Sequence, residues 1–427
     1  MVPAHVPALV QEMDVTQPLN LKKILYISYD GMTDPLGQSQ VIPYLLGLSK
    51  YGYRFTILSF EKKAKFQKLE KKIRSLLDPA GINWEPVWFT SKPPVLAKFY
   101  DIIQMRRAAL RLQRREQFDL VHCRSYPSSE NGLLLKRRFG VKFLFDMRGF
   151  WADEKKDGGA WSQDSFIFRR VYRHYKKKEK EFIREADAII SLTEAGKVEM
   201  AGWPDCKPKY APDVIPCCAD MNLFTVRTAE QKAGSRKQLG LPENELVLSY
   251  LGSLGSWYML EEMLGFFATI KKQYPNARLL FITHSPEQMV KSRISHYGLK
   301  EEDIKIVAAE REEVPVYAKA ADISISFIRP VYSKLSSSPT KLGELLSMGI
   351  PVFVNAGVGD VENIVNAVEG GVVIRNFTQG DYEQAISQIP LLLKLDENKI
   401  REKSERYYSL EEGIRRYAEV YQRLFSK

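Results

Sequence analysis

Short runs of hydrophobic and β-branched residues alternate along this chain with longer segments whose apolar residues recur at helical spacing. The short runs predict strands and the longer segments predict amphipathic helices. In the first half, strands are expected at Lys23–Ser28, Arg54–Phe60, Trp84–Phe89, Leu120–Arg124, Lys142–Arg148 and Ala188–Thr193. In the second half, they are expected at Leu246–Leu251, Arg278–Thr283, Ile304–Val307, Ile323–Phe327, Pro351–Val354 and Val372–Ile374.

Helices are predicted between these strands, so the chain reads as an α/β protein with parallel sheets. In the first half they are expected at Gln38–Tyr51, Phe66–Leu77, Val95–Gln117 and Phe166–Ala186. Two strand–helix series in tandem predict two Rossmann-like domains, which suits a length of 427 residues. We expect a flexible tail at residues 1–20, domains at 21–217 and 218–408, and a final segment at 409–427.

Charge divides the two halves. Residues 1–200 hold 35 Lys and Arg against 23 Asp and Glu, whereas residues 201–427 hold 28 against 29. This asymmetry predicts an anionic partner for the first half, and an acidic membrane surface or a phosphate-bearing acceptor would fit. Nucleic acid is not expected, because no nucleic-acid-binding module accompanies the cations. A solvated charged face is the plainer alternative for each basic helix.

The compartment is inferred from features that the sequence lacks. No apolar run is long enough to span a bilayer, and the first twenty residues do not resemble a signal peptide. The cysteines show neither metal-ligand spacing nor a disulfide framework. We therefore expect a cytoplasmic protein, with peripheral attachment to the inner face of the plasma membrane as a further option.

Residues 338–352 read Ser-Pro-Thr-Lys-Leu-Gly-Glu-Leu-Leu-Ser-Met-Gly-Ile-Pro-Val and carry the most informative pattern. A polar loop runs into a predicted helix at Lys341–Met348. The free N–H groups of a helix N-terminus attract anions, and Lys341 adds a positive charge there. Glu344, one turn later, could accept hydrogen bonds from ribose. The segment indicates a nucleotide-sugar site, although an ordinary loop with solvated Lys341 and Glu344 would have the same pattern.

Two glycine-containing loops follow the first strand of each half. Tyr29–Gln40 contains Gly37 and Gln38, and Gly252–Tyr258 contains Gly252 and Ser253. Glycine permits close approach of a backbone to phosphate or sugar, but plain strand–helix turns use it as well. Neither loop has the G-x-G-x-x-G spacing, so no dinucleotide cofactor is expected, and no cofactor of another kind is indicated.

The ordered combination of these features resembles the retaining nucleotide-sugar glycosyltransferases of family four, which have the GT-B fold. The resemblance extends over about residues 21–427 and rests on several segments. These are Phe118–His122, Ala186–Thr193, Val214–Phe224, Val314–Asp322, Glu344–Val352 and Ser409–Tyr421. It implies two domains facing across a cleft, with the C-terminal helix returning to the first domain.

The resemblance also implies an activity. It predicts transfer of a sugar, with retention, from a nucleotide sugar to a glycan or lipid-linked acceptor. No metal is expected, because the sequence has no Asp-x-Asp pair and no Cys/His cluster with ligand spacing. Cell-surface polysaccharide or glycolipid synthesis would be the setting. A nucleotide-sugar epimerase and a non-catalytic sugar- or membrane-binding subunit of the same fold are the alternatives.

The chain departs from the family's donor-site pattern at three positions. Ser336 stands where the first Glu of the E-x7-E motif belongs, and only Glu344 matches the second. Ser253 and Tyr258 replace the usual Arg and Lys after the first strand of the donor domain. We expect Lys341 to supply the missing positive charge.

Candidate site residues follow from the sequence patterns and from the resemblance. The expected catalytic residues are Arg124, Arg148 and Lys341. The expected donor-binding residues are Gly37, Gln38, Gly252, Ser253, Ser338, Pro339, Thr340, Lys341, Leu342 and Glu344. The expected acceptor-side residues are His122, Asp146 and Arg148, although a histidine at the end of a strand is more often a satisfied core residue.

Overall fold

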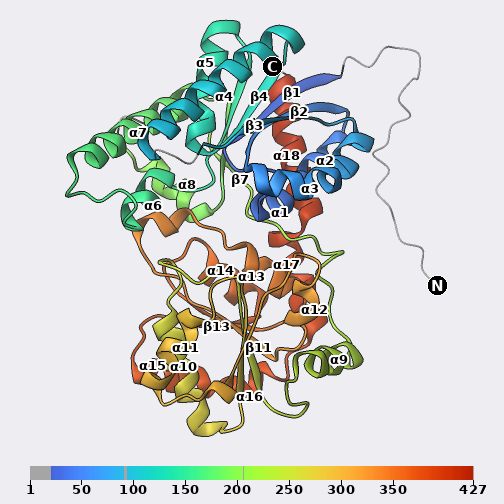
Figure 1. Cartoon of the computed structure of the whole chain (residues 1–427), viewed down its shortest axis with the longest axis vertical. Helices are drawn as coiled ribbons and strands as arrows, with labels where there is room; N and C mark the ends of the chain where they lie inside the picture. Colours follow the sequence, from blue (N-terminus) through green and yellow to red (C-terminus); the bar gives the residue numbers. More distant parts are fainter. Residues whose placement is uncertain (1–20, 91–93, 205, 427) are drawn as a thin grey trace.

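The computed structural model describes residues 21–90, 94–204 and 206–426. These residues form two domains, each built around one sheet of parallel strands, and the first domain lies above the second in Figure 1. The expected tail at residues 1–20 lies outside the described residues. The first sheet, ordered β3-β2-β1-β4-β5-β6-β7, contains β1 (Lys22–Ser28), β2 (Tyr53–Glu61), β3 (Asn83–Trp88), β4 (Leu120–Arg124), β5 (Lys142–Asp146), β6 (Ala188–Ser191) and β7 (Asp213–Val214). The second, ordered β10-β9-β8-β11-β12-β13, contains β8 (Val247–Leu251), β9 (Arg278–Ile282), β10 (Ile304–Val307), β11 (Ile323–Ser326), β12 (Val352–Asn355) and β13 (Gly371–Ile374).

Both sheets have the doubly wound strand order, so the predicted pair of Rossmann-like domains is confirmed. All expected strands are present with ends within two residues of the prediction. Only the short edge strand β7 was not predicted. The strands read as nearly continuous apolar runs because helices cover both faces of a parallel sheet.

Successive residues of each central strand enter different cores. In β1, Leu25 and Ile27 pack on one face of the first sheet, whereas Ile24 and Tyr26 pack on the other. The second sheet likewise has a separate core on each face. This alternation follows from the twofold repeat of side chains along a strand.

Helices of the first domain cover both faces of its sheet. They are α1 (Pro35–Gln40), α2 (Ile42–Ser49), α3 (Lys63–Leu77), α4 (Pro94–Glu116), α5 (Ser125–Phe139), α6 (Trp151–Asp157), α7 (Phe166–Glu185) and α8 (Glu194–Ala201). The prediction of a single helix at Gln38–Tyr51 was wrong, because the structure has the two helices α1 and α2 there. Val41 between them has a non-helical backbone (φ −126°, ψ −64°), and Pro43 lacks the N–H that a continuous helix would use.

Helices of the second domain surround its sheet in the same way. They are α9 (Ala229–Leu239), α10 (Leu260–Gln273), α11 (Gln288–Ile294), α12 (Val314–Ala318), α13 (Thr340–Ser347), α14 (Val361–Val368), α15 (Gln379–Ile386), α16 (Ile389–Leu392) and α17 (Glu397–Tyr408). A short 3-10 helix, η4 (Tyr332–Ser336), precedes α13. Within the described residues, no helix is both long enough and apolar enough to cross a bilayer.

The last helix, α18 (Leu410–Phe425), returns to the first domain as predicted (Figure 1). It packs on α2, where Gly47 leaves room for Ile414. The chain crosses between the domains twice, and the crossings are joined by backbone hydrogen bonds. The Ala219 N–H donates to Tyr408 C=O at 2.7 Å, and the Leu410 N–H donates to Ala219 C=O at 3.1 Å.

Candidate functional site

Loops at the carboxyl ends of the two sheets meet between the domains. The Phe150 N–H, after β5, donates to Ser336 Oγ of η4 at 2.7 Å. The Cys217 N–H donates to Ser338 Oγ at 3.1 Å, just before α13. Ligands of open α/β sheets bind outside these strand ends, so the junction is the place to look for a site.

On the second-domain side of the junction, the Lys341 ammonium is buried and has no hydrogen-bond partner among the described residues. Its Nζ lies 3.8 Å from the centre of the Tyr258 ring and 5.5 Å from that of Tyr250. It also touches Gly252, where an added Cβ would lie 1.7 Å from Nζ. Gly252 has φ +129°, which an L side chain rarely adopts. A buried cation that lies over aromatic rings and has no hydrogen-bond acceptor among the described residues is suited to an anionic ligand.

Glu344 lies one turn further along α13 and is paired with an arginine that sequence analysis did not identify. Its Oε1 accepts a hydrogen bond from Arg311 Nη1 at 2.5 Å, and Arg311 lies over the Phe224 ring. Burial raises the pKa of Glu344, and this effect is opposed by Arg311 and Lys341. Arg311 carried no sequence signal because it belongs to a polar loop remote from α13. Its role depends on tertiary contact.

The three departures from the family pattern have distinct structural roles. Ser336 accepts the hydrogen bond from Phe150 and donates to Ser333 C=O at 3.2 Å, so it joins the domains. Tyr258 provides the ring beneath the Lys341 ammonium. The backbone carbonyl of Ser253 accepts from the Tyr250 hydroxyl at 2.6 Å. The cation of Lys341 therefore lies over Tyr258, the position at which the sequence resemblance leads us to expect a lysine.

On the first-domain side, Arg124 ends β4 and is buried, and Arg148 follows β5 with its side chain 7% exposed. Arg124 Nε donates to Asp30 Oδ2 at 3.3 Å, and Arg148 Nη2 donates to Cys217 Sγ at 3.2 Å. Arg148 has φ +54°, an uncommon value for a residue other than glycine. Arg124 Nη1 and Arg148 Nε are buried without a hydrogen-bond partner among the described residues. These groups are suited to anionic oxygens.

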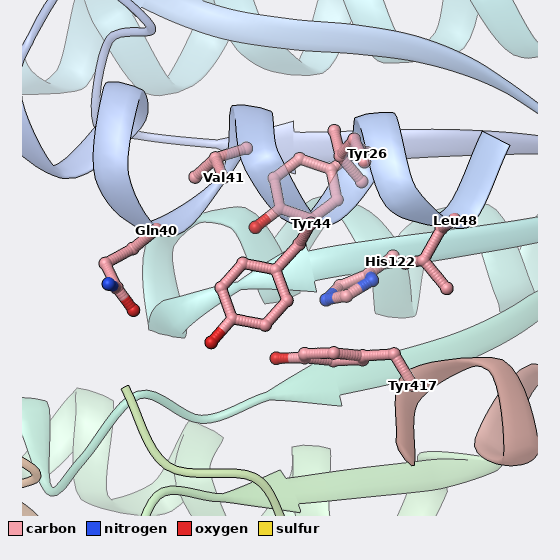
Figure 2. Close-up of a pocket in the computed structure, with 8 residues that line it drawn as sticks. Tyr26, Gln40, Val41, Tyr44, Leu48, His122 and Tyr417 are labelled. Carbon is pink, nitrogen blue, oxygen red and sulfur yellow. The ribbon is translucent and has the colours of Figure 1, made fainter. Parts of the chain in front are cut away.

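His122 lies inside the first domain rather than at its surface. Its Nδ1 is 2.7 Å from the Tyr421 hydroxyl and its Nε2 is 3.4 Å from Asp146 Oδ2. Burial lowers the pKa of His122, so the ring is neutral at neutral pH. Figure 2 shows it beside Tyr417, around a cavity of about 10 Å³. The structure therefore places His122 as a core residue, next to Asp146.

The other predicted donor residues fall into two groups. Ser338, Pro339, Thr340 and Leu342 surround the start of α13 and thus lie near Lys341. Gly37 and Gln38 lie in the first domain, where Gly37 packs on the Gly31 carbonyl and Gln38 Nε2 donates to Thr33 C=O at 3.2 Å. The contacts of Gly37 and Gln38 among the described residues stay within their own loop, and their donor role remains a prediction.

Comparison with known proteins agrees with both domains. The family model described as "Glycosyl transferase 4-like domain" matches residues 46–207, and "Glycosyl transferases group 1" matches residues 231–407. Sucrose-phosphate synthase from Thermosynechococcus elongatus superimposes with a TM-score of 0.69 at 16% identity, over 95% of this chain and 99% of that chain. The chain belongs to the GT-B glycosyltransferases.

Other relatives of this GT-B glycosyltransferase are distant in sequence. Anabaena Alr3699/HepE, solved in complex with UDP-glucose, has a TM-score of 0.67 at 16% identity over 94% of this chain and 99% of that chain. D-inositol 3-phosphate glycosyltransferase from Corynebacterium diphtheriae is 22% identical over 281 residues, which are 64% of this chain and 62% of the relative. The chain thus spans less than two thirds of the length of the curated relatives.

The Arg311–Glu344 pair makes a prediction for this GT-B glycosyltransferase. Arg311→Ala leaves a buried carboxylate without its cation, so the free energy of unfolding at neutral pH should fall by about 3 kcal/mol. Without Arg311, the folded-state pKa of Glu344 rises further above its unfolded value. The folded state then gains stability as pH falls through that pKa and loses it as pH rises. Denaturant unfolding should therefore show a smaller loss at pH 5 than at pH 8.

Arg375→Ala is the matched control. Arg375 pairs with Glu362 on the exposed surface of the same domain. Arg375→Ala should lower the free energy of unfolding by less than about 1 kcal/mol at either pH. An equal loss at pH 5 and pH 8 for Arg311→Ala would show that Glu344 does not depend on Arg311 for its charge.

Proposed function

We propose that this chain transfers a sugar from a nucleotide-sugar donor to a phosphate-bearing glycan or lipid-linked acceptor, with retention at the anomeric carbon. The observation that carries the proposal is the buried ammonium of Lys341 at the start of α13, which has no hydrogen-bond partner in the part of the chain that the structure describes. A diphosphate there would satisfy both the ammonium and the free N–H groups of the helix. Synthesis of a cell-surface polysaccharide or glycolipid is the proposed setting.

In this proposal the chain promotes departure of the nucleoside diphosphate. The bond between the anomeric carbon and the diphosphate oxygen breaks, and negative charge grows on the departing phosphate. Lys341 and the first turn of α13 stabilise that charge, because they are in place before the reaction starts. The acceptor hydroxyl attacks on the same face of the sugar and passes its proton to the departing phosphate oxygen. No protein base or metal is invoked.

Glu344 is proposed to hold the ribose of the donor. Arg311 occupies its Oε1, whereas Oε2 accepts no hydrogen bond from the described residues and is free for a ribose hydroxyl. UDP is the first nucleotide to test, because the fold neighbour Alr3699/HepE was solved with UDP-glucose. Arg124 and Arg148 are proposed to hold the acceptor phosphate through their unpartnered N–H groups.

Sugar transfer can be tested directly. The protein would be incubated with UDP-, GDP-, ADP- and dTDP-sugars, with D-inositol 3-phosphate or a bacterial lipid extract as acceptor. Acceptor-dependent release of nucleoside diphosphate together with a glycosylated product is the expected result. Conversion of the donor without an acceptor would indicate an epimerase instead. Binding without turnover would indicate a non-catalytic subunit.

Two glycines of one loop test the position of the diphosphate. Gly252→Ala should weaken UDP binding by about tenfold or more, since the new Cβ displaces Lys341 and a charge-assisted contact is worth roughly 1.5–3 kcal/mol. Gly255→Ala is the control, because nothing lies within 4 Å of its added Cβ. Calorimetric titration with UDP measures both. Equal affinity in the two variants would remove Lys341 and Gly252 from the site.

We further propose that the first domain rests on an anionic membrane. Helices α4, α5 and α7 lie side by side in the first domain (Figure 1). The exposed cations of these three helices without a carboxylate within 4 Å, among the described residues, are Arg106, Arg107, Arg111, Arg114, Arg138, Arg169, Arg170, Arg173, Lys177 and Arg184. Phe166 and Ile167, each 61% exposed, begin α7. Cations beside exposed apolar residues suit the interface of an acidic bilayer.

The membrane proposal predicts a specific loss of vesicle binding. Each cation near an acidic leaflet contributes about 1 kcal/mol, so reversing three arginines to Glu at positions 106, 111 and 114 should weaken binding about a hundredfold or more. Added salt should weaken the parent as well. Sedimentation with phosphatidylglycerol-containing vesicles measures this. Reversal of the exposed Lys237, Lys272 and Lys399 of the second domain is the charge-matched control. An equal loss of vesicle binding in both triple variants would contradict a membrane-binding face on the first domain.

A further inference from the structure

The C-terminal helix carries two buried tyrosines into the first domain beside the acceptor-side arginines. Tyr417 and Tyr421 are four residues apart and therefore lie on one face of α18. They are 4% and 0% exposed. Burial raises the pKa of both hydroxyl groups well above the usual value, so both remain protonated and can donate hydrogen bonds.

A chain of hydrogen bonds runs from these hydroxyl groups to Asp146. The ionised Asp146 can only accept, so the neutral His122 ring carries its proton on Nε2, 3.4 Å from Asp146 Oδ2. His122 Nδ1 then accepts a hydrogen bond from the Tyr421 hydroxyl at 2.7 Å. The Tyr417 hydroxyl donates to the same Oδ2 at 3.0 Å. Two groups thus hold Oδ2 of Asp146. One is the Tyr417 hydroxyl of α18, and the other is the His122 ring, which Tyr421 of α18 contacts in turn.

The second carboxylate oxygen faces Arg148. Asp146 Oδ1 is 3.9 Å from Arg148 Nη1 and has no hydrogen-bond partner within the described residues. Burial opposes ionisation of Asp146, but Arg148 and the hydrogen bond from His122 hold its pKa below the usual value. The carboxylate is therefore charged and attracts the Arg148 guanidinium 3.9 Å away. The opposite edge of Arg148 reaches Cys217 at the domain crossing.

We propose that Tyr417 and Tyr421 are positioning residues that fix Arg148 through Asp146 and His122. The inference rests on the proposed function, in which Arg148 holds a phosphate of the acceptor. With Oδ2 occupied, Oδ1 remains directed at Arg148, and the guanidinium presents its unpartnered Nε to the ligand. A guanidinium binds phosphate well only when its planar donors are aligned, so a small rotation of Asp146 weakens the contact.

Inorganic phosphate is the probe that isolates this effect. The melting temperature of the full chain is measured as phosphate replaces chloride at constant ionic strength, which reports phosphate affinity by linkage. Arg148→Gln and Tyr417→Phe should each weaken the apparent affinity by about tenfold, the value of one charge-assisted contact. The double variant should bind as weakly as Arg148→Gln alone, because Tyr417 acts only through Arg148. Phosphate bound at Lys341 is common to all variants and cancels.

Tyr382→Phe is the control for loss of a buried hydroxyl. Tyr382 donates to Glu262 C=O at 3.2 Å in the second domain. Its removal should lower the melting temperature without changing phosphate affinity. A merely structural role for Tyr417 would give the same pattern in Tyr417→Phe and would overturn the proposal. Additive losses in the double variant would overturn it too.

Sugar-transfer assays separate this inference from the proposed function. If the variants lose phosphate affinity as expected but no donor and acceptor pair is turned over, the proposed function fails and the positioning role stands. If the parent transfers sugar and Tyr417→Phe matches it in phosphate affinity and in acceptor KM, the positioning role fails alone.

Discussion

The paired crossing of the chain between its domains is the constraint on which the rest of the structure depends. Ala219 and Tyr408 lie where the chain leaves the first domain and where it returns, and their backbone hydrogen bond joins the crossings. Buried backbone groups must be paired, so neither crossing can move alone. Cys217, beside this joint, contacts both Arg148 and Ser338. The two sides of the proposed site are therefore positioned by the same few residues.

This arrangement explains why isolated charges persist at the domain junction. Lys341 lies over aromatic rings, whereas Arg124 at the end of β4 and Arg148 after β5 are held by carboxylates and by the Cys217 sulfur. Unsatisfied buried donors reduce stability, and proteins keep such groups mainly where a ligand completes them. We infer that the energetic cost is recovered when a diphosphate and an anionic acceptor bind.

Much of this fold could be predicted from the sequence, because strands buried on both faces leave apolar runs that are unambiguous when they alternate with helices. The split between α1 and α2 was missed, since a helical pattern continues through Val41 although its backbone does not. The site was predicted only in part. Lys341 and Glu344 share one helix and one motif, whereas Arg311 reaches Glu344 from another loop. Tyr417 and His122 meet through a fold that local spacing cannot reveal.

The central claim is that the Lys341 ammonium is kept free for the diphosphate of a nucleotide donor. Titration of the parent and of Lys341→Met with UDP and with uridine tests it most directly. Lys319→Met serves as control, since its ammonium is bonded to Thr225 and Gln231 instead. We predict that Lys341→Met loses about tenfold or more in UDP affinity and keeps its affinity for uridine. The control variant Lys319→Met should keep its affinity for both ligands. Undiminished preference for UDP over uridine in Lys341→Met would contradict the account.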